Sequence, residues 1–163
     1  MIRIATIGTS TITRTFLDAA AAVPEVTVTT AYSRDGDHAR RFAAETGIPG
    51  SASDLDALLA SADIDAVYIA SPNAIHFAQA LRTVEAGKHV LVEKPAVLTP
   101  ADFATLTDAA ARTGVIVLEA MRNAYDPALA AIADLSAQLG PVRRASFAYC
   151  QRSARYDKVL AGE

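Results

Sequence analysis

The sequence contains little cysteine, no tryptophan and only a small net charge. Cys150 is the single cysteine in 163 residues, so an internal disulfide and a thiol-ligated metal cluster are both excluded. The three histidines are scattered, without the spacing that metal ligands require. A formal net charge of −3 provides no basic surface for nucleic acid or for an anionic membrane.

Long hydrophobic runs are also missing. No apolar stretch approaches the roughly 20 residues of a transmembrane helix. The first residues, Met1–Ile7, form a short strand pattern and lack the basic start and long apolar run of a signal peptide. We therefore expect a cytoplasmic protein without membrane partners. A G-x-S-x-G elbow is absent as well, which argues against a Ser-His-Asp hydrolase.

The composition, 52% hydrophobic and 20% charged, is that of a globular protein, and short apolar runs alternate with helical patterns. This alternation predicts an α/β fold with a doubly wound parallel sheet, a Rossmann domain over residues 1–120. The expected strands are Ile2–Ile7, Val26–Tyr32, Gly50–Ala52, Ala66–Ala70, Val90–Val92 and Val115–Leu118. The expected helices are Thr11–Val23, Asp37–Thr46, one capped by Ser53, Ala74–Ala86, and one from the Thr99 cap to Gly114, with Phe103 on its inner face.

The pattern changes after residue 120. Pro127–Leu139 reads as one more helix, and Val142–Cys150 alternates like a strand with one apolar face. We expect residues 121–163 to be the first helix and strand of an incomplete second α/β domain for substrate binding or dimerisation. The alternative is that the strand joins the edge of the first sheet or pairs with another copy of the chain.

The first expected strand runs directly into Gly8-Thr9-Ser10-Thr11-Ile12-Thr13, followed by a helix. This is the position of the glycine-rich turn that binds pyrophosphate in dinucleotide-binding folds. Gly8 permits the tight turn, whereas Ser10 and Thr13 replace the second and third glycines of the motif. The free N–H groups at the helix start offer an anion site. The alternative is an ordinary turn capped by Ser10 or Thr11.

The second expected strand ends in Tyr32-Ser33-Arg34-Asp35. NAD-specific folds usually place an acid here to bind the ribose hydroxyls. Ser33 can hydrogen-bond a 2′-phosphate, and Arg34 can pair with it, so we favour NADP, with NAD possible through Asp35. The alternative is a solvated loop in which Asp35 or Asp37 caps the next helix.

Polar residues also follow the fourth and fifth strands, at the switch point where ligands bind such sheets. The sequence resembles Gfo/Idh/MocA-type oxidoreductases, which act on sugars, polyols and dihydrodiols. The motifs that carry the resemblance are Ile7-Gly8-Thr9-Ser10, Tyr32-Ser33-Arg34, Ala70-Ser71-Pro72-Asn73 with His76, Ala86-Gly87-Lys88-His89-Val90-Leu91-Val92-Glu93-Lys94-Pro95, and Glu119-Ala120-Met121-Arg122. Together with Ser33-Arg34, the stretch Arg152–Asp157 is most similar to dihydrodiol or aldose dehydrogenases that use NADP.

The resemblance implies that Lys94 is the catalytic lysine, an amine that accepts or donates the proton of a reacting hydroxyl. Pro95 favours an extended backbone at Lys94. Glu93 is expected to anchor cofactor or to tune Lys94. The alternative is an ordinary solvent-facing loop lysine.

Further cofactor contacts follow from the same resemblance. Asn73 and His76 are expected beside the nicotinamide, at the end of the Ala70-Ser71-Pro72 segment; otherwise Asn73 is only a helix cap and His76 only a polar first-turn residue. Glu119 and Arg122 are expected near the nicotinamide amide or the substrate, or else as a salt-bridged hinge pair.

The leading hypothesis is therefore the cofactor-binding part of an NAD(P)-dependent dehydrogenase that moves a hydride between NADP(H) and a sugar, polyol or dihydrodiol. The expected partners are a small-molecule substrate, a carbohydrate or diol, and a second copy of the full-length protein. One alternative is a catalytically incomplete dinucleotide-binding module or sensor. A weaker one is another nucleotide ligand, such as a methyl donor, because a fold alone does not fix a function.

Overall fold

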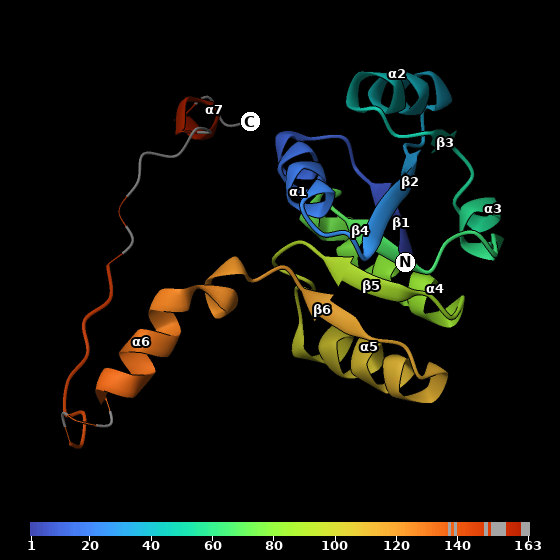
Figure 1. Ribbon diagram of the computed structural model, residues 1–163. Coiled ribbons are helices and arrows are strands. Elements are labelled where there is room, and N and C mark those ends of the chain that lie inside the picture. The colour runs from blue at the N-terminus through green and yellow to red at the C-terminus, as the bar shows by residue number, and fades with distance from the viewer. Residues whose placement is uncertain (137, 139, 149, 151–155, 161–163) are drawn as a thin grey trace. The chain divides into compact units, whose positions relative to one another are not determined.

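The computed structural model describes residues 1–136, 138, 140–148, 150 and 156–160 (Figure 1). The chain divides into two compact units, Met1–Arg122 and Asn123–Glu163.

The first unit is a six-stranded sheet in the order β3-β2-β1-β4-β5-β6, with every pair parallel. This doubly wound Rossmann arrangement confirms the expected fold class. The strands are β1 (Ile2–Ile7), β2 (Val26–Tyr32), β3 (Gly50–Ala52), β4 (Ala66–Ile69), β5 (His89–Val92) and β6 (Val117–Glu119). The helices are α1 (Thr11–Ala21), α2 (Gly36–Thr46), α3 (Leu55–Ala60), α4 (His76–Glu85) and α5 (Pro100–Thr113), and the 3-10 turns are η1 (Asn73–Ile75) and η2 (Arg122–Tyr125).

Side-chain caps fix where several helices begin. Thr99 caps α5 as expected, because its hydroxyl accepts the Asp102 N–H at 3.1 Å. The cap expected at Ser53 is wrong. The next residue, Asp54, caps α3 instead, with one carboxylate oxygen accepting two N–H groups of the first turn. A carboxylate reaches two donors at once, whereas a serine hydroxyl one residue earlier does not.

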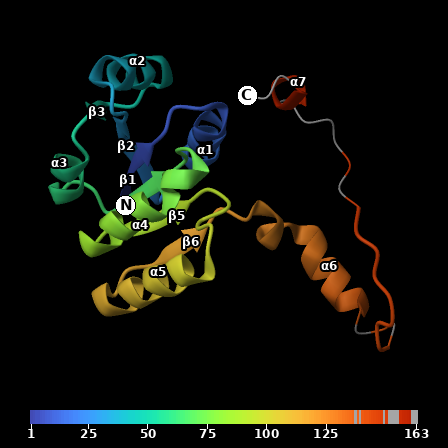
Figure 2. The same ribbon diagram turned by 180° about the vertical axis from the view of Figure 1, so that it is seen from behind.

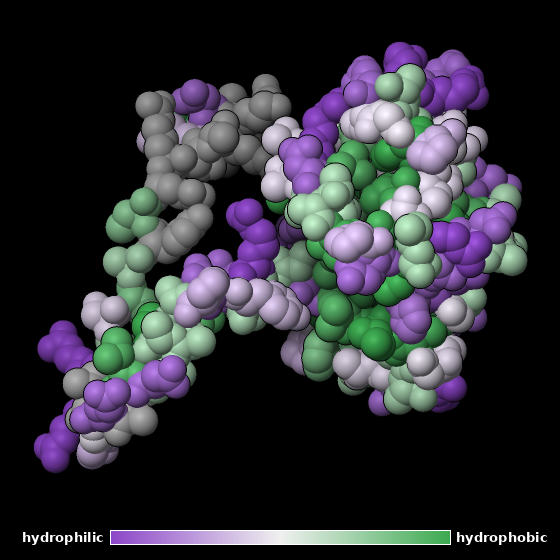
Figure 3. Space-filling view, in the orientation of Figure 1, coloured by the Kyte–Doolittle hydropathy of each residue, from purple (hydrophilic) through white to green (hydrophobic). Residues whose placement is uncertain are grey.

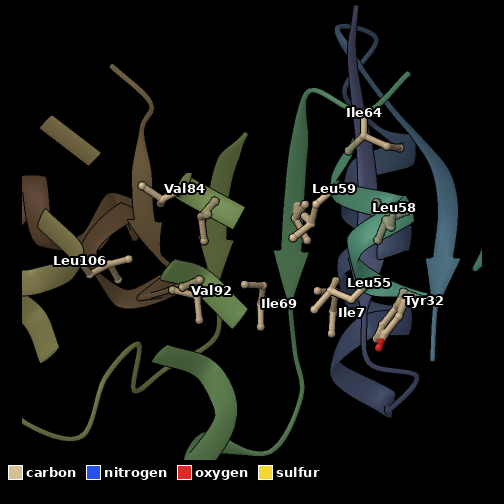
Figure 4. Close-up of a cluster of buried hydrophobic side chains, with 14 of the residues drawn as sticks. Ile7, Tyr32, Leu55, Leu58, Leu59, Ile64, Ile69, Val84, Val92 and Leu106 are labelled. Atoms are coloured by element: carbon tan, nitrogen blue, oxygen red, sulfur yellow. The ribbon is translucent and has the colours of Figure 1, made fainter. Parts of the chain in front are cut away.

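The two faces of the sheet are covered by different helices (Figures 1 and 2). Alternate residues of β1, β4 and β5 point to α3, α4 and α5, where they form the larger hydrophobic cluster (Figure 4). The smaller cluster joins β2 to α1 and α2. Leu106 of α5 is buried as expected, but Phe103 is not, since 58% of its surface is exposed. The helical face that meets the sheet is therefore narrower than the apolar stripe in the sequence.

The second unit contains α6 (Pro127–Ser136) and α7 (Tyr156–Leu160). Apolar residues lie at the surface of α6, as Figure 3 shows, and Leu129, Ile132 and Leu135 are all exposed. Of the expected helix 127–139, residues 137 and 139 lie outside the described residues, as do residues 152–155 of the stretch 152–157. In the described part of the chain, no helix is long and apolar enough to cross a bilayer.

The prediction of a strand over residues 142–150 is wrong for the described residues of this range. Residues 142–148 and 150 belong to no strand, and Tyr149 lies outside the described residues. Alternation of apolar and polar residues predicts a strand with one buried face, but a strand also needs neighbouring strands to pair with. Among the described residues of the second unit, no such neighbour is present.

Candidate functional site

The carboxyl ends of the central strands lie level along one edge of the sheet. Ile7 pairs with both Tyr32 and Ile69, and Val92 pairs with both Ile69 and Glu119. The loops that leave these strands therefore start side by side. From β1 the chain crosses to β2 on one side, whereas β4 lies on the other side, and this reversal marks the point where parallel sheets bind ligands.

Gly8 opens the loop after β1, and two features require a glycine there. Its φ is +108°, a conformation that side chains disfavour. A Cβ atom at this position would lie 2.4 Å from the Ala70 carbonyl oxygen at the end of β4. The turn thus packs its backbone directly against the end of β4, with no room between them for a side chain.

Helix α1 begins directly after this turn and presents free amides. Its first backbone bond runs from the Arg14 N–H to the Ser10 carbonyl at 3.2 Å, so the N–H groups of Thr11, Ile12 and Thr13 have no partner in the helix. The Ser10 side chain makes no capping bond, so the alternative of an ordinary capped turn is not what forms. Unpaired amides and a free hydroxyl directly after a tight glycine turn fit the pyrophosphate of a dinucleotide.

The loop after β2 contains the residues expected to choose between the two dinucleotides. Asp35 is engaged as the cap of α2, where one oxygen accepts the Asp37 and His38 N–H groups at 2.9 and 3.1 Å. The His38 amide bond and the Asp37 amide bond lower the pKa of Asp35. The guanidinium of Arg34 is exposed and has no hydrogen bond or ion pair to any described residue. The cap alternative for Asp35 is therefore correct, and Arg34 is free to meet a ligand.

His38 is a residue that the sequence reasoning missed. Its Nε2 lies 2.7 Å from the Thr9 hydroxyl, so it connects the turn after β1 to the first turn of α2. Because Asp35 is the N-cap, His38 falls in the first helical turn, facing the loop that Asp35 closes.

Lys94 and Pro95 follow β5, and a cis peptide bond joins them. Lys94 is exposed, and its amine has no hydrogen bond or ion pair within the described part of the chain. The loop backbone is fixed on both sides. The Glu93 N–H donates to the Ile69 carbonyl at 2.8 Å, and the Ala96 N–H donates to a Glu119 carboxylate oxygen at 2.9 Å.

Glu93 and Glu119 thus have structural partners beside Lys94. The Tyr68 hydroxyl donates to Glu93 at 2.8 Å, and the Tyr68 ring stacks on Phe16 of α1 with 3.9 Å between centroids. Burial and the bond to Glu93 raise the pKa of Tyr68. The alternative of a salt-bridged pair with Arg122 is wrong for Glu119, since no ion pair joins these two described residues and its carboxylate accepts the Ala96 amide instead.

The loop after β4 approaches the Lys94–Pro95 turn through His76. This residue is 1% exposed, and its ring nitrogens lie 2.9 Å from the Pro95 carbonyl oxygen and 2.7 Å from the Ser71 carbonyl oxygen. Asn73 is exposed and lies inside η1, so it does not cap α4. The structure therefore brings together the turns at Gly8, Ser71 and Pro95.

Comparison with known proteins agrees with this geometry. Residues 2–121 match the GFO_IDH_MocA model, described as "Oxidoreductase family, NAD-binding Rossmann fold". The chain is 41% identical over 162 residues to scyllo-inositol 2-dehydrogenase (NADP(+)) IolU of Bacillus subtilis (strain 168), covering 99% of this chain and 49% of the relative. It is 40% identical over 156 residues to dTDP-3,4-didehydro-2,6-dideoxy-alpha-D-glucose 3-reductase of Streptomyces violaceoruber, covering 91% and 45%.

Solved structures give the same result. KijD10, a 3-ketoreductase from Actinomadura kijaniata in complex with TDP-benzene and NADP, superposes with a TM-score of 0.77 at 32% identity, covering 84% of this chain and 43% of that one. GenD2 from gentamicin A biosynthesis, in complex with NAD, gives a TM-score of 0.77 at 28% identity, covering 83% and 39%. The chain spans about half the length of the curated relatives it matches. It belongs to the GFO_IDH_MocA family of oxidoreductases and contains that family's NAD(P)-binding Rossmann domain.

Proposed function

We propose that the protein carrying this chain is an NADP-dependent oxidoreductase that interconverts a hydroxyl and a carbonyl group on a sugar or cyclitol. The observation that carries the proposal is Lys94, an exposed amine without a partner in the described residues, at the same edge of the sheet as the Gly8 turn. The relatives named for scyllo-inositol and for a deoxysugar nucleotide support a sugar or cyclitol ring as substrate.

The residues present divide the binding of the dinucleotide between two loops. The amides of Thr11 and Ile12, with the Ser10 hydroxyl, would hold the pyrophosphate at the start of α1. Ser33 and Arg34 would hold the adenosine end, and the positive charge of Arg34 favours a 2′-phosphate over a bare hydroxyl. Because Asp35 is engaged in capping α2, this loop does not offer the free acid that usually binds the ribose of NAD.

Lys94 would carry the proton transfer. When bound, the nicotinamide ring accepts a hydride from the alcohol carbon or returns one to the carbonyl carbon. During oxidation the neutral Lys94 amine takes the proton of the substrate hydroxyl, and during reduction the ammonium group gives it back to the carbonyl oxygen. The exposed side chain has no competing partner in the described residues, so this proton is not diverted to a neighbouring carboxylate.

The test of this role is Lys94→Ala in the protein that carries this chain, with NADP⁺ and the probes scyllo-inositol and D-xylose. We expect turnover of the accepted probe to fall by about 100-fold or more, the usual contribution of a general acid–base group. Lys88→Ala is the matched control, because the Lys88 amine donates to the Ser61 carbonyl, away from the strand edge. Its turnover should stay at the parent level.

Unchanged turnover in Lys94→Ala would overturn the role of the lysine. If the parent protein binds NADPH but turns over neither probe nor 1,5-anhydro-D-fructose, the cofactor-binding part of the proposal stands and its substrate class fails. A dinucleotide-binding module or sensor is then the better description.

The cofactor preference is tested by titration with NADPH and NADH, following nicotinamide fluorescence. Loss of a charged hydrogen bond to phosphate costs about 1.5–3 kcal/mol, so we expect Arg34→Ala to weaken NADPH binding by at least tenfold. NADH binding should be unchanged, because NADH lacks the phosphate. Arg112→Ala, at the end of α5, is the control. Equal loss for both dinucleotides, or no initial preference for NADPH, would refute the assignment.

A further inference from the structure

We propose that His76 is a positioning residue that fastens the Lys94–Pro95 turn to the loop after β4 and so holds Lys94 in its reactive position. The inference rests on the proposed function, since it concerns the lysine that moves the proton. It assigns to His76 a role within the protein, in place of the direct contact with nicotinamide that the sequence suggests.

The contacts of the ring carry the argument. His76 is the first residue of α4 and is 1% exposed, so its ring is not accessible to a ligand. Nδ1 lies 2.9 Å from the Pro95 carbonyl oxygen, and Nε2 lies 2.7 Å from the Ser71 carbonyl oxygen. Both partners are carbonyl oxygens, so the ring makes both hydrogen bonds at once when each of its nitrogens carries a proton. A single buried side chain then links the backbone of two loops, and both loops follow central strands of the sheet.

These contacts matter because nothing else described holds the Lys94 side chain. The amine is without a protein partner there, so its position follows from the backbone of the turn. That backbone is fixed at Glu93 by the Ile69 carbonyl and at Ala96 by Glu119. Among the described residues, His76 supplies the only other bond to the backbone of the turn, at Pro95, the residue next to the lysine.

We expect the bonds of the two ring nitrogens to affect different properties of the protein. The bond to Pro95 orients Lys94, and misplacing a reacting group by about 1 Å can cost about 100-fold in rate. The bond to Ser71 instead holds the loop against which Gly8 packs, where a Cβ would meet the Ser71 amide nitrogen at 3.2 Å. Loss of the first should lower turnover, and loss of the second should weaken dinucleotide binding.

Two conservative variants separate these effects. In His76→Asn the amide nitrogen can occupy the place of Nδ1 and retain the bond to Pro95. In His76→Gln it can occupy the place of Nε2 and retain the bond to Ser71. We expect His76→Gln to lower turnover of scyllo-inositol at least tenfold while the Kd for NADPH stays within about threefold of the parent. His76→Asn should retain most of the turnover and bind NADPH more weakly.

A second measurement does not depend on catalysis. Amide hydrogen exchange of the cofactor-free protein should speed up over residues 93–97 in His76→Gln and over residues 70–75 in His76→Asn, with the rest of the domain unchanged. Because each variant keeps one of the two bonds, both are expected to fold even if His76→Ala does not.

The proposal is overturned if the two variants lose turnover equally, or if exchange increases over the whole domain in both. The comparison with Lys94→Ala shows which claim has failed. If Lys94→Ala loses turnover and His76→Gln does not, only the positioning role is wrong. If Lys94→Ala retains turnover, the proton-transfer role of Lys94 in the proposed function is wrong, and the positioning role fails with it.

Discussion

Thr13 occupies the position of the third glycine in the dinucleotide-binding motif, where helix and strand pack closely. Its side chain is fully buried, and its hydroxyl has no hydrogen-bond partner among the described atoms. The Thr6 hydroxyl on β1 is also buried and has no described hydrogen-bond partner. A buried donor without a partner costs about 1–3 kcal/mol, so this helix start is less stable than its packing would allow.

Thr13→Val should therefore stabilise the protein. Valine replaces the hydroxyl by a methyl group of similar size and removes the unpaired donor, so we expect the free energy of unfolding to rise by about 1 kcal/mol. Urea denaturation measures it. Thr83→Val is the matched control, because Thr83 is equally buried but donates to the Gln79 carbonyl at 2.8 Å. A loss of stability in Thr13→Val as large as in Thr83→Val would contradict this account.

At the same scale, the sequence predicts some site residues better than others. Gly8 is predictable because a strand followed by a tight turn and a helix needs a positive φ. The contacts of His76 and His38 are not, because each depends on a partner from another loop. No local pattern shows that two carbonyl groups, from Ser71 and Pro95, will converge on one ring.

Among the elements, β1 begins at a charged anchor. Arg3 donates to both carboxylate oxygens of Asp65, at 2.9 and 2.8 Å, and Asp65 also accepts the Arg3 amide at 2.8 Å. The Arg3 side-chain bonds, followed by the Arg3 backbone bond, lower the pKa of Asp65 well below its ordinary value. The segment before β4 is thereby fixed to the first strand.

This anchor predicts how stability depends on pH. The pKa of Asp65 is lower in the folded state than in the unfolded chain, so the carboxylate contributes its full stabilisation of the fold above the unfolded pKa of about 4. This stabilisation is lost as the pH falls below about 4. The stability difference between the parent and Asp65→Asn should therefore narrow from pH 5 to pH 3 in urea titrations. Asp63→Asn, which loses one exposed contact to Arg3, should show a small difference throughout. A stability difference between the parent and Asp65→Asn that widens as the pH falls would refute this expectation.

Element types were largely predictable, whereas some boundaries and one strand were not. The helix expected from Ala74 begins instead as η1 and becomes α4 only at His76, because a 3-10 turn and an α-helix share similar apolar spacing. All six expected strands form, and β1 and β4 match best because they are apolar runs that become largely buried. The sixth strand begins at Val117, two residues later than expected. Residues 142–150 also alternate between apolar and polar side chains. A strand forms, however, only where neighbouring strands can pair with it, and a local pattern does not show whether they are present.

For the whole molecule, both hydrophobic clusters belong to the first unit. No buried member of either cluster comes from beyond residue 122. The first unit therefore has a hydrophobic core built from its own residues, and we expect it to fold without residues 123–163.

A chain ending at Arg122 tests this directly. We expect its urea midpoint and its Kd for NADPH to equal those of the 163-residue chain, because no core residue and no proposed cofactor residue is removed. Circular dichroism and nicotinamide fluorescence provide the two readouts. A markedly lower midpoint for the shorter chain would mean that the second unit supports the first.

The close contact between Gly8 and Ala70 also bears on the order of events during synthesis. The turn emerges early from the ribosome, but the surface it rests against belongs to a strand made about 60 residues later. Nascent chains that lack β4 have the motif without its support. Cofactor capture is then a long-range property, gained only when β1 and β4 have paired. A dinucleotide present in the cell would act on the nearly finished domain as a late stabiliser and not as a template for its first turn.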